Sequence, residues 1–131
     1  MEPREFLAFA QALPLDSEAA RRSAISRAYY AAYHKGRRLL TLINVNVPKS
    51  AYGHPETFGC LMNSKNEYLV RAGRKLADLH SRRIVADYEL EDQEMVSHAV
   101  ALSCLRTAEE TPSLSLSKTI RKKPSMASRT P

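Results

Sequence analysis

The stretch from Arg21 to Leu42, RRSAISRAYYAAYHKGRRLLTL, constrains the fold most strongly because it is rich in alanine and contains no proline. Its apolar residues recur at steps of three and four, which is the period of one helical face. That face consists of Ile25, Tyr29, Ala32, Gly36, Leu39, Leu40 and Ile43. The stretch therefore predicts a long helix with one buried side, around which the remaining chain packs.

A second row of residues follows a neighbouring face of the same predicted helix. Its members are Arg27, Tyr30, His34 and Arg38, which are again spaced by three or four positions. Arg27 and His34 are two helical turns apart, or about 10 Å along the axis. One edge of the helix is therefore expected to present an arginine, a tyrosine and a histidine together.

Every other periodic segment also has the helical period. Expected helices run from Glu2 to Ala12, from a cap at Asp16 or Ser17 to about Asn44–Pro48, and from Gly53-His54-Pro55 onward. A further helix is expected from Ser64 to Asp87–Leu90, and a last one from about Glu91 to Glu110. The sequence predicts an all-α, up-and-down bundle of about four to five helices.

Other predicted helices also have an apolar side. In the segment from Glu2 to Ala12 it consists of Phe6, Leu7, Phe9, Ala10 and Leu13. In the segment that follows Ser64 it consists of Tyr68, Leu69, Ala72, Leu76, Leu79 and Val85, with Gly73 as a weak point or a place of close helix approach. In the last helix it consists of Met95, Val96, Ala99, Leu102, Ser103 and Leu105-Arg106.

The charge of the chain is divided unevenly. The whole sequence has a net charge of +6, but residues 112–131 hold five basic residues and no acidic one. Residues 1–111 therefore hold 15 basic and 14 acidic residues, so the basic character belongs to the tail. We expect one helical domain over residues 1–111 and a disordered tail over 112–131, which either contacts RNA, DNA or an acidic partner or only aids solubility.

Length and composition exclude several classes. The 131 residues suffice for one domain with its own core, and no apolar run approaches the ~18 residues that span a membrane. The first residues lack a secretory pattern. Cys60 and Cys104 lie in apolar helical patterns without CxxC spacing, which favours free thiols. A cytoplasmic location is the expectation.

Two strings carry a family resemblance. Ser23 to His34 reads SAISRAYYAAYH and resembles the second helix of the HEPN family of prokaryotic helical domains. Leu79 to Tyr88 reads LHSRRIVADY and resembles that family's L-x-x-x-R-x-x-A-D-Y. Gly53-His54 also stands where many members have a Gly/Thr-His pair. The matches follow the family's order from Asp16 to about Arg106, and two strings in order are more specific than either alone.

The resemblance implies a bundle that commonly forms a homodimer. In many members the dimer joins two R-x(4–6)-H motifs into a metal-independent RNase site. Other members are non-catalytic partners of a nucleotidyltransferase, parts of toxin–antitoxin or phage-defence systems, or nucleotide-binding modules. The resemblance therefore implies RNA, a nucleotidyltransferase or an antitoxin as partner.

Two arginine–histidine pairs fit the motif. Arg27 and His34 fit R-x6-H, with Tyr30 between them, and Arg74 and His80 fit R-x5-H. The better characterised RNase members usually have the motif on a later helix, often with a polar residue after the arginine, whereas Ala28 follows Arg27 here. Arg37 and Arg38 are candidates for nucleic-acid contacts; Arg83, Asp87 and Tyr88 belong to the second string.

Metal-independent RNA cleavage suits these residue types. A histidine can take the proton of a 2′-hydroxyl, and an arginine can stabilise the charge on a phosphorane. Two copies of Arg27 and His34 across a dimer axis would supply two bases and two cations. Exposure of both at a groove would support RNA chemistry, whereas burial of both in the core would exclude it.

A structural interpretation of the same residues stands beside the catalytic one. Arg27 can pair with Asp87 on a neighbouring helix, or Arg83 can pair with Asp87 within one helix. His54 fits a helix start, and His98 a surface or packing position. The histidines lack HxxxH and HExxH spacing, and the chain has no glycine-rich phosphate loop, so neither a metal site nor an NTPase is expected, and no cofactor.

Three functions are compatible with these observations. The first is a HEPN-like toxin or defence component that cleaves RNA as a dimer through Arg27 and His34. The second is a non-catalytic interaction module paired with a nucleotidyltransferase or another effector. The third is a nucleotide-binding module that uses Arg27, Tyr30, Arg37 and Arg38.

Overall fold

The protein is an all-α bundle in the computed structural model, which describes residues 1–45, 47 and 53–111. The five α-helices are α1 (Pro3–Gln11), α2 (Glu18–Leu42), α3 (Gly53–Met62), α4 (Glu67–Tyr88) and α5 (His98–Glu110), and a 3-10 turn, η1, covers Glu94–Val96. No strand occurs in these ranges, so the predicted fold class is confirmed. The predicted tail, residues 112–131, and residues 49–52 of the predicted loop lie outside the described residues.

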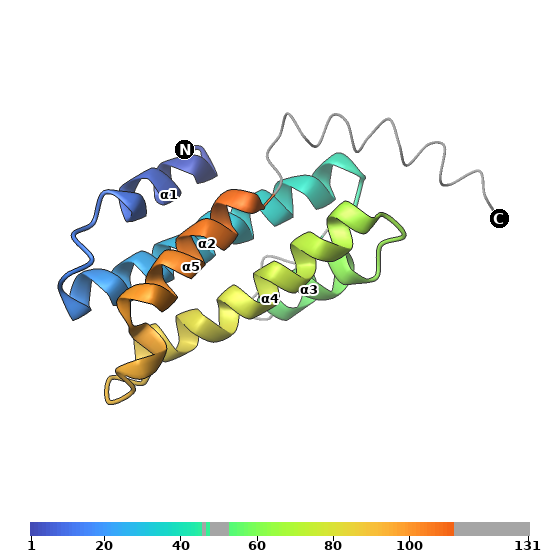
Figure 1. The fold of residues 1–131 in the computed structure, drawn as a ribbon. Coiled ribbons are helices and arrows are strands. Elements are labelled where there is room, and N and C mark those ends of the chain that lie inside the picture. Colours follow the sequence, from blue (N-terminus) through green and yellow to red (C-terminus); the bar gives the residue numbers. More distant parts are fainter. Residues whose placement is uncertain (46, 48–52, 112–131) are drawn as a thin grey trace.

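Helix α2 is the centre of the bundle. It contacts each of the other four α-helices, and Figure 1 shows it running the length of the molecule with α4 antiparallel to it. The predicted apolar face of α2 is buried as far as Leu40, and Ile43 is partly buried against the core. Tyr29, in the middle of the helix, is fully buried. The stretch that most constrained the fold is therefore its core helix.

The helix starts follow local capping chemistry. The Ser17 hydroxyl accepts a hydrogen bond from the Ala20 amide at 3.1 Å, as predicted for α2. The predicted cap at Ser64 is wrong, because Asn66 accepts from the Tyr68 amide and begins α4. The Ser64 hydroxyl instead accepts from the Asn66 amide and holds the turn before the helix.

The last helix begins later than the sequence suggested. The prediction of a start near Glu91 is wrong: the chain turns, forms η1, and enters α5 at His98 with Ser97 as the cap. The predicted apolar face is displaced as well, since Leu102 is 39% exposed. The buried side of α5 consists of Ala101, Cys104, Leu105 and Ala108.

Two glycines allow α3 to lie close to its neighbours. A Cβ atom at Gly73 of α4 would stand 2.7 Å from Met62 Cγ and 2.9 Å from Leu61 Cβ. A Cβ atom at Gly36 of α2 would stand 3.2 Å from a methyl group of Leu61. The expectation of a close helix approach at Gly73 is confirmed, and it places the C-terminal end of α3 close to α2 and α4.

Both cysteines are free thiols, with Cys104 buried and Cys60 partly buried. Burial raises the pKa of the Cys104 thiol to about 11. None of the described helices is long and apolar enough to cross a membrane.

Candidate functional site

Most basic side chains of α2 hold the fold together. Arg21 donates to the carbonyl oxygens of Val96, Leu15 and Asp16, with the Val96 bond at 2.9 Å. It thus ties the start of α2 to η1 and to the α1–α2 connection. Arg21 is therefore committed to structural contacts.

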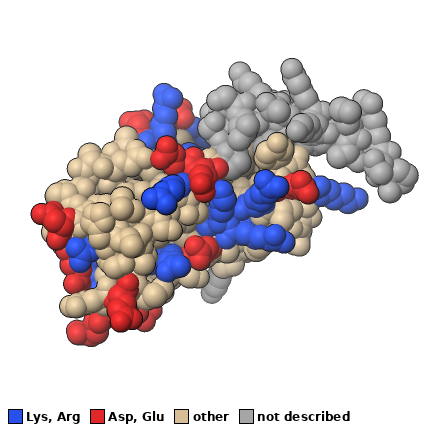
Figure 2. Space-filling view, viewed as in Figure 1, with Lys and Arg blue, Asp and Glu red and all other residues tan. Residues whose placement is uncertain are grey.

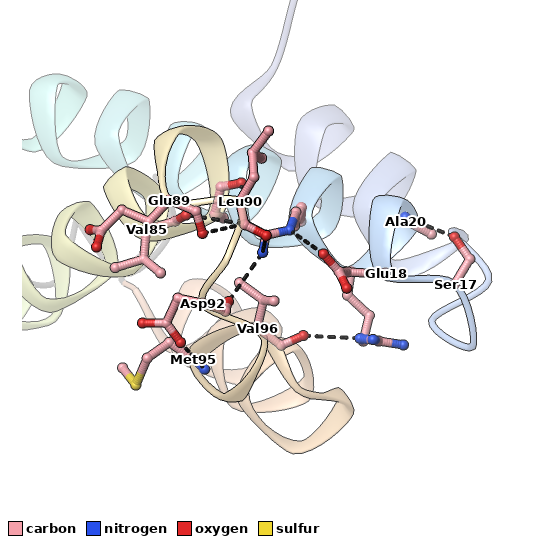
Figure 3. A network of polar contacts seen from close by, with 12 residues as sticks. Ser17, Glu18, Ala20, Val85, Glu89, Leu90, Asp92, Met95 and Val96 are labelled. Carbon is pink, nitrogen blue, oxygen red and sulfur yellow. Dashed lines mark hydrogen bonds and ion pairs between the residues drawn. The ribbon is translucent and has the colours of Figure 1, made fainter.

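Arg22 has the largest structural role of the α2 cations. It is 8% exposed, and its Nε donates to the Glu18 carboxylate at 2.9 Å. Its two other nitrogens donate to five carbonyl oxygens at the end of α4 and in the following turn, those of Val85, Ala86, Glu89, Leu90 and Asp92. Figure 3 shows four of these residues, Val85, Glu89, Leu90 and Asp92, gathered around the guanidinium. Arg22 therefore caps the carbonyl end of α4.

Three further cations of α2 are also engaged. The Lys35 ammonium donates to the Ala108 carbonyl at 3.1 Å and caps α5; burial lowers the pKa of Lys35. Arg37 donates to the Tyr33 hydroxyl, the Thr57 hydroxyl and the Val47 carbonyl, which ties α3 and the preceding segment to α2. Arg38 pairs with the Glu2 carboxylate and lowers the pKa of Glu2. Arg37 and Arg38, predicted to contact nucleic acid, thus have intramolecular roles.

Arg27 is the exception among these cations. Within the described part of the chain it makes no hydrogen bond and no ion pair. Its guanidinium carbon lies 5.5 Å from the ring centre of Phe6 and 5.1 Å from that of Tyr30. The side chain is half-buried. The guanidinium is therefore held by two aromatic rings while its N–H groups remain available to a ligand.

His34 lies against the same phenylalanine. Its ring is nearly parallel to that of Phe6, at a centroid distance of 5.9 Å and an angle of 16°. His34 is exposed, and desolvation by its neighbours followed by the charges of Arg37 and Arg38 lowers its pKa. Phe6 of α1 thus contacts both members of the predicted pair. Neither member is sealed in the core.

A cluster of aromatic and imidazole rings fills the junction of α2, α3 and α4. The Tyr29 hydroxyl is hydrogen-bonded to His54 Nδ1, and the Tyr29 ring lies 5.3 Å from that of His80. The rings of His54 and His80 are stacked at 5.7 Å. Tyr33 covers His54 at 4.4 Å, and Phe58 contacts His80 at 5.1 Å. The helix-start histidine of the sequence is thus part of a packed ring cluster.

Arg83 borders this cluster. It is 8% exposed, its guanidinium lies over the rings of Tyr29 and Tyr30, and one of its nitrogens is 3.4 Å from His80 Nε2. It pairs with Asp87 at 3.4 Å, as the spacing of four residues allows. Its Nε is buried and has no partner among the described residues. Arg83 is therefore anchored mainly by ring contacts.

The predicted pairing of Arg27 with Asp87 is wrong. Asp87 accepts hydrogen bonds from the Ser26 hydroxyl at 3.2 Å and from Arg83. Successive residues of a helix are rotated by about 100°, so Ser26 faces α4 while Arg27 faces α1. The Arg27 side chain therefore lies on the side of α2 that faces α1.

The imidazoles of the cluster are held in the neutral form. Desolvation lowers the pKa of His54, with further lowering by the charges of Arg83, Arg37 and His34. Desolvation likewise lowers the pKa of His80, followed by Arg83 and His54. Burial raises the pKa of the Tyr29 hydroxyl. These groups therefore form a neutral hydrogen-bonded core that faces one buried cation.

The side chains of the alternative catalytic pair, Arg74 and His80, do not lie together. Arg74 is exposed, whereas His80 points into the ring cluster, and six residues of a helix place them about 120° apart around the α4 axis. The arginine beside His80 is Arg83. Tyr88 of the second string is 71% exposed, and His98 is exposed at the start of α5.

A pocket of about 280 Å³ opens at the seam between α1 and α2. His34 forms part of its wall, together with Pro3, Phe6, Arg37, Arg38 and Thr41. The pocket is continuous with the Phe6 ring that Arg27 covers. Phe6 thus lines the pocket and also contacts Arg27, and the candidate site, the α1–α2 groove, consists of Arg27, Phe6 and the pocket.

Surface charge is not concentrated at this site alone. Figure 2 shows acidic side chains at the end of the bundle that holds the α4–α5 turn, and basic side chains nearer the opposite end. No group of three His, Cys, Asp or Glu residues able to hold a metal ion occurs in the described part of the chain.

The sequence did not reveal the role of three residues. Phe6 was recognised only as an apolar residue of the first helix, although it contacts both Arg27 and His34. Arg22 carried one signal, its i,i+4 spacing from Glu18, which says nothing of the five carbonyls. Ser26 carried no signal of its contact with Asp87.

Comparison of the chain with family models, curated proteins and solved structures finds no match.

Proposed function

We propose that this protein is a HEPN-like component of a toxin or defence system that cleaves RNA as a homodimer without a metal ion. The observation that carries the proposal is the uncommitted guanidinium of Arg27. Arg21, Arg22, Lys35, Arg37 and Arg38 all donate hydrogen bonds within the fold, whereas Arg27 has only ring contacts among the described residues. A half-buried cation with free donors is suited to a phosphate.

His34 supplies the matching base. Its lowered pKa keeps the imidazole neutral at neutral pH, and its exposure gives it access to a hydroxyl group. The aromatic neighbours Phe6 and Tyr30 hold Arg27 in place, which reduces the entropy lost when it binds a phosphate.

The reaction follows from these roles. His34 takes the proton of a 2′-hydroxyl, O2′ forms a bond to phosphorus, and Arg27 stabilises the negative charge that develops on the phosphoryl oxygens. The bond from phosphorus to O5′ then breaks, O5′ takes a proton from solvent, and the protonated His34 returns its proton to solvent. The products are a 2′,3′-cyclic phosphate and a 5′-hydroxyl. Dimerisation belongs to the proposal because the resemblance implies it, and two copies of Arg27 and His34 would supply two bases and two cations.

The test is cleavage of a single-stranded RNA by purified protein in EDTA. Wild type is expected to cleave, and His34→Ala and Arg27→Ala to lose about 100-fold or more in rate. Arg74→Ala and His98→Ala are matched controls, because both side chains are exposed and lie on other helices, and they are expected to cleave normally. Light scattering and circular dichroism report whether each variant remains dimeric and folded.

Folded wild-type protein that leaves RNA intact would overturn the nuclease proposal. That result would favour a non-catalytic HEPN-like interaction module, and co-purification with a nucleotidyltransferase or another effector would be the next experiment. Loss of cleavage in His98→Ala but not in His34→Ala would also contradict the assignment.

A further inference from the structure

The pocket beside His34 has the size and lining of a nucleobase site. Its volume of about 280 Å³ lies just below the range of about 300–1,000 Å³ that is typical of small-molecule pockets, so it suits a fragment of one nucleotide. It opens at the α1–α2 seam, away from the ring cluster of Tyr29, His54 and His80. None of the contacts that hold that cluster together has to change for the pocket to be filled.

One wall offers a stacking surface. The rings of Phe6 and His34 are nearly parallel, and His34 is the exposed member of the pair, since Phe6 is half-buried and also contacts Arg27. Unpaired bases of single-stranded RNA are commonly bound by stacking on phenylalanine, tyrosine and histidine rings. Two adjoining rings in a pocket wall favour a planar, aromatic ligand over an aliphatic one.

The lining also presents hydrogen-bond donors. Arg38 uses one donor for the Glu2 carboxylate and one for the Met1 carbonyl, which leaves three of its five N–H groups uncommitted among the described residues. Thr41 also lines the pocket, but its hydroxyl already donates to the Arg37 carbonyl at 3.1 Å, so Arg38 is the main source of free donors. The positive wall therefore favours a base edge that carries acceptors.

Guanine fits this requirement best. Its O6 and N7 are two adjacent acceptors that an arginine fork can bind together, whereas adenine places the N6 amino donor beside N7. Cytosine and uracil have smaller stacking surfaces than guanine. A lining with aromatic rings and free arginine donors thus favours guanine over adenine by its edge and over the pyrimidines by its size.

We propose that the α1–α2 pocket is a guanine-binding subsite, walled by Phe6 and His34 and read by Arg38. Its role in RNA cleavage rests on the proposed function: the guanine would belong to a nucleotide flanking the phosphate held by Arg27. Binding of the base itself requires no catalysis.

The first experiment titrates GMP, AMP and UMP separately into uniformly ¹⁵N-labelled protein and follows backbone amide shifts. GMP is expected to shift the amides of Phe6, His34, Arg38 and Thr41, with an affinity roughly tenfold higher than that of AMP. Arg38→Gln is expected to remove the preference for GMP. Equal affinities for the three nucleotides, or shifts confined to other residues, would overturn the proposal.

Two variants separate pocket filling from damage to the fold. Thr41→Tyr adds a ring at an exposed position that lines the pocket and removes no core contact, so it is expected to abolish GMP binding in a folded protein. Phe9→Ala is the matched control on α1, since Phe9 is 59% exposed and does not line the pocket. Retained GMP binding in Thr41→Tyr would place the ligand elsewhere and refute the subsite.

The outcome is distinguishable from that of the nuclease test. RNA cleavage without a preference for GMP would support the catalytic assignment of Arg27 and His34 and would overturn the guanine subsite. GMP binding at this pocket by a protein that leaves RNA intact would sustain the subsite and overturn the nuclease.

Discussion

Tyr29 and His54 join the middle of the core helix to the first turn of α3, because the buried hydroxyl of Tyr29 is hydrogen-bonded to His54 Nδ1. This contact couples the tautomer of His54 to the phenol, since Nδ1 accepts when the phenol donates and donates when the phenol accepts. The rings of Tyr29 and Tyr33 both lie against that of His54, at centroid distances of 5.6 and 4.4 Å. The ring cluster is therefore both a packing device and a buried polar network.

Tyr29→Phe is expected to destabilise the protein by about 1–3 kcal/mol, because it keeps the ring contacts and leaves His54 Nδ1 without its partner. Urea unfolding measures the loss. Tyr88→Phe is the matched control, since Tyr88 is 71% exposed, and it is expected to change the free energy of unfolding by less than about 0.5 kcal/mol. Equal stabilities for the two variants would show that the Tyr29 hydroxyl contributes nothing.

Arg22→Met is expected to cost about 3 kcal/mol, because five carbonyl oxygens at the end of α4 lose their donor and Glu18 loses its partner. Hydrogen exchange should show a loss of amide protection first in the last turn of α4 and in the turn that follows. Arg22→Lys should recover only part of the stability, since an ammonium lacks the planar fork. Arg106→Met, at an exposed position of α5, is the control; a similar loss there would refute the capping role.

Stability is expected to fall in mild acid. The pKa values of His54 and His80 are lowered in the folded state by desolvation and then by Arg83, whereas the unfolded chain takes up protons near the ordinary value of about 6.5. The unfolded state thus binds more protons. The free energy of unfolding is therefore highest above about pH 6.5 and decreases as the pH falls toward the lowered values.

The charges around these imidazoles support this direction. Arg37 and His34 of α2 and Arg83 of α4 face His54, and Arg83 and His54 face His80. His80→Gln is expected to flatten the dependence between about pH 7.5 and about pH 5, as measured by urea unfolding. His98→Gln, at an exposed site, should leave the dependence as in the wild type. A steeper dependence in His80→Gln would contradict the assignment.

The two glycines Gly73 and Gly59 offer a matched comparison. Gly73→Ala places a Cβ atom 2.7 Å from Met62 Cγ and 3.0 Å from the Met62 amide nitrogen, and is expected to cost about 1–3 kcal/mol. Gly59→Ala meets nothing within 4 Å and is expected to stabilise α3 by up to about 1 kcal/mol. Thermal unfolding of both variants measures the difference. Stabilisation by both would show that α3 moves away from α4 at little cost.

The sequence predicted the fold well where hydrophobic period decided it. The core face of α2, the Ser17 cap and the start of α3 at Gly53 agree with the structure. The start of α5 was wrong because Arg22 draws the carbonyls of Glu89, Leu90 and Asp92 to itself, and no local pattern near Glu91 reveals a donor about 70 residues earlier.

The candidate site was predictable in its residue types and less so in its contacts. Arg27 and His34 share an edge because helical spacing requires it. Their link through Phe6 depends on how α1 packs, and the choice of Ser26 and Arg83 as partners of Asp87 depends on the rotation of α2 against α4. Such rotations are set by packing between distant segments, so a single sequence leaves them open.

The capping of α4 by Arg22 and of α5 by Lys35 also bears on the order in which the helices form. Both cations belong to α2, which precedes the helices that it completes. During translation, the ribosome releases these donors before the carbonyl groups that they will bind have been synthesised. Helices α4 and α5 can thus be capped by donors of α2 as soon as they are synthesised. The order of the segments along the chain therefore suits folding that begins in its first half.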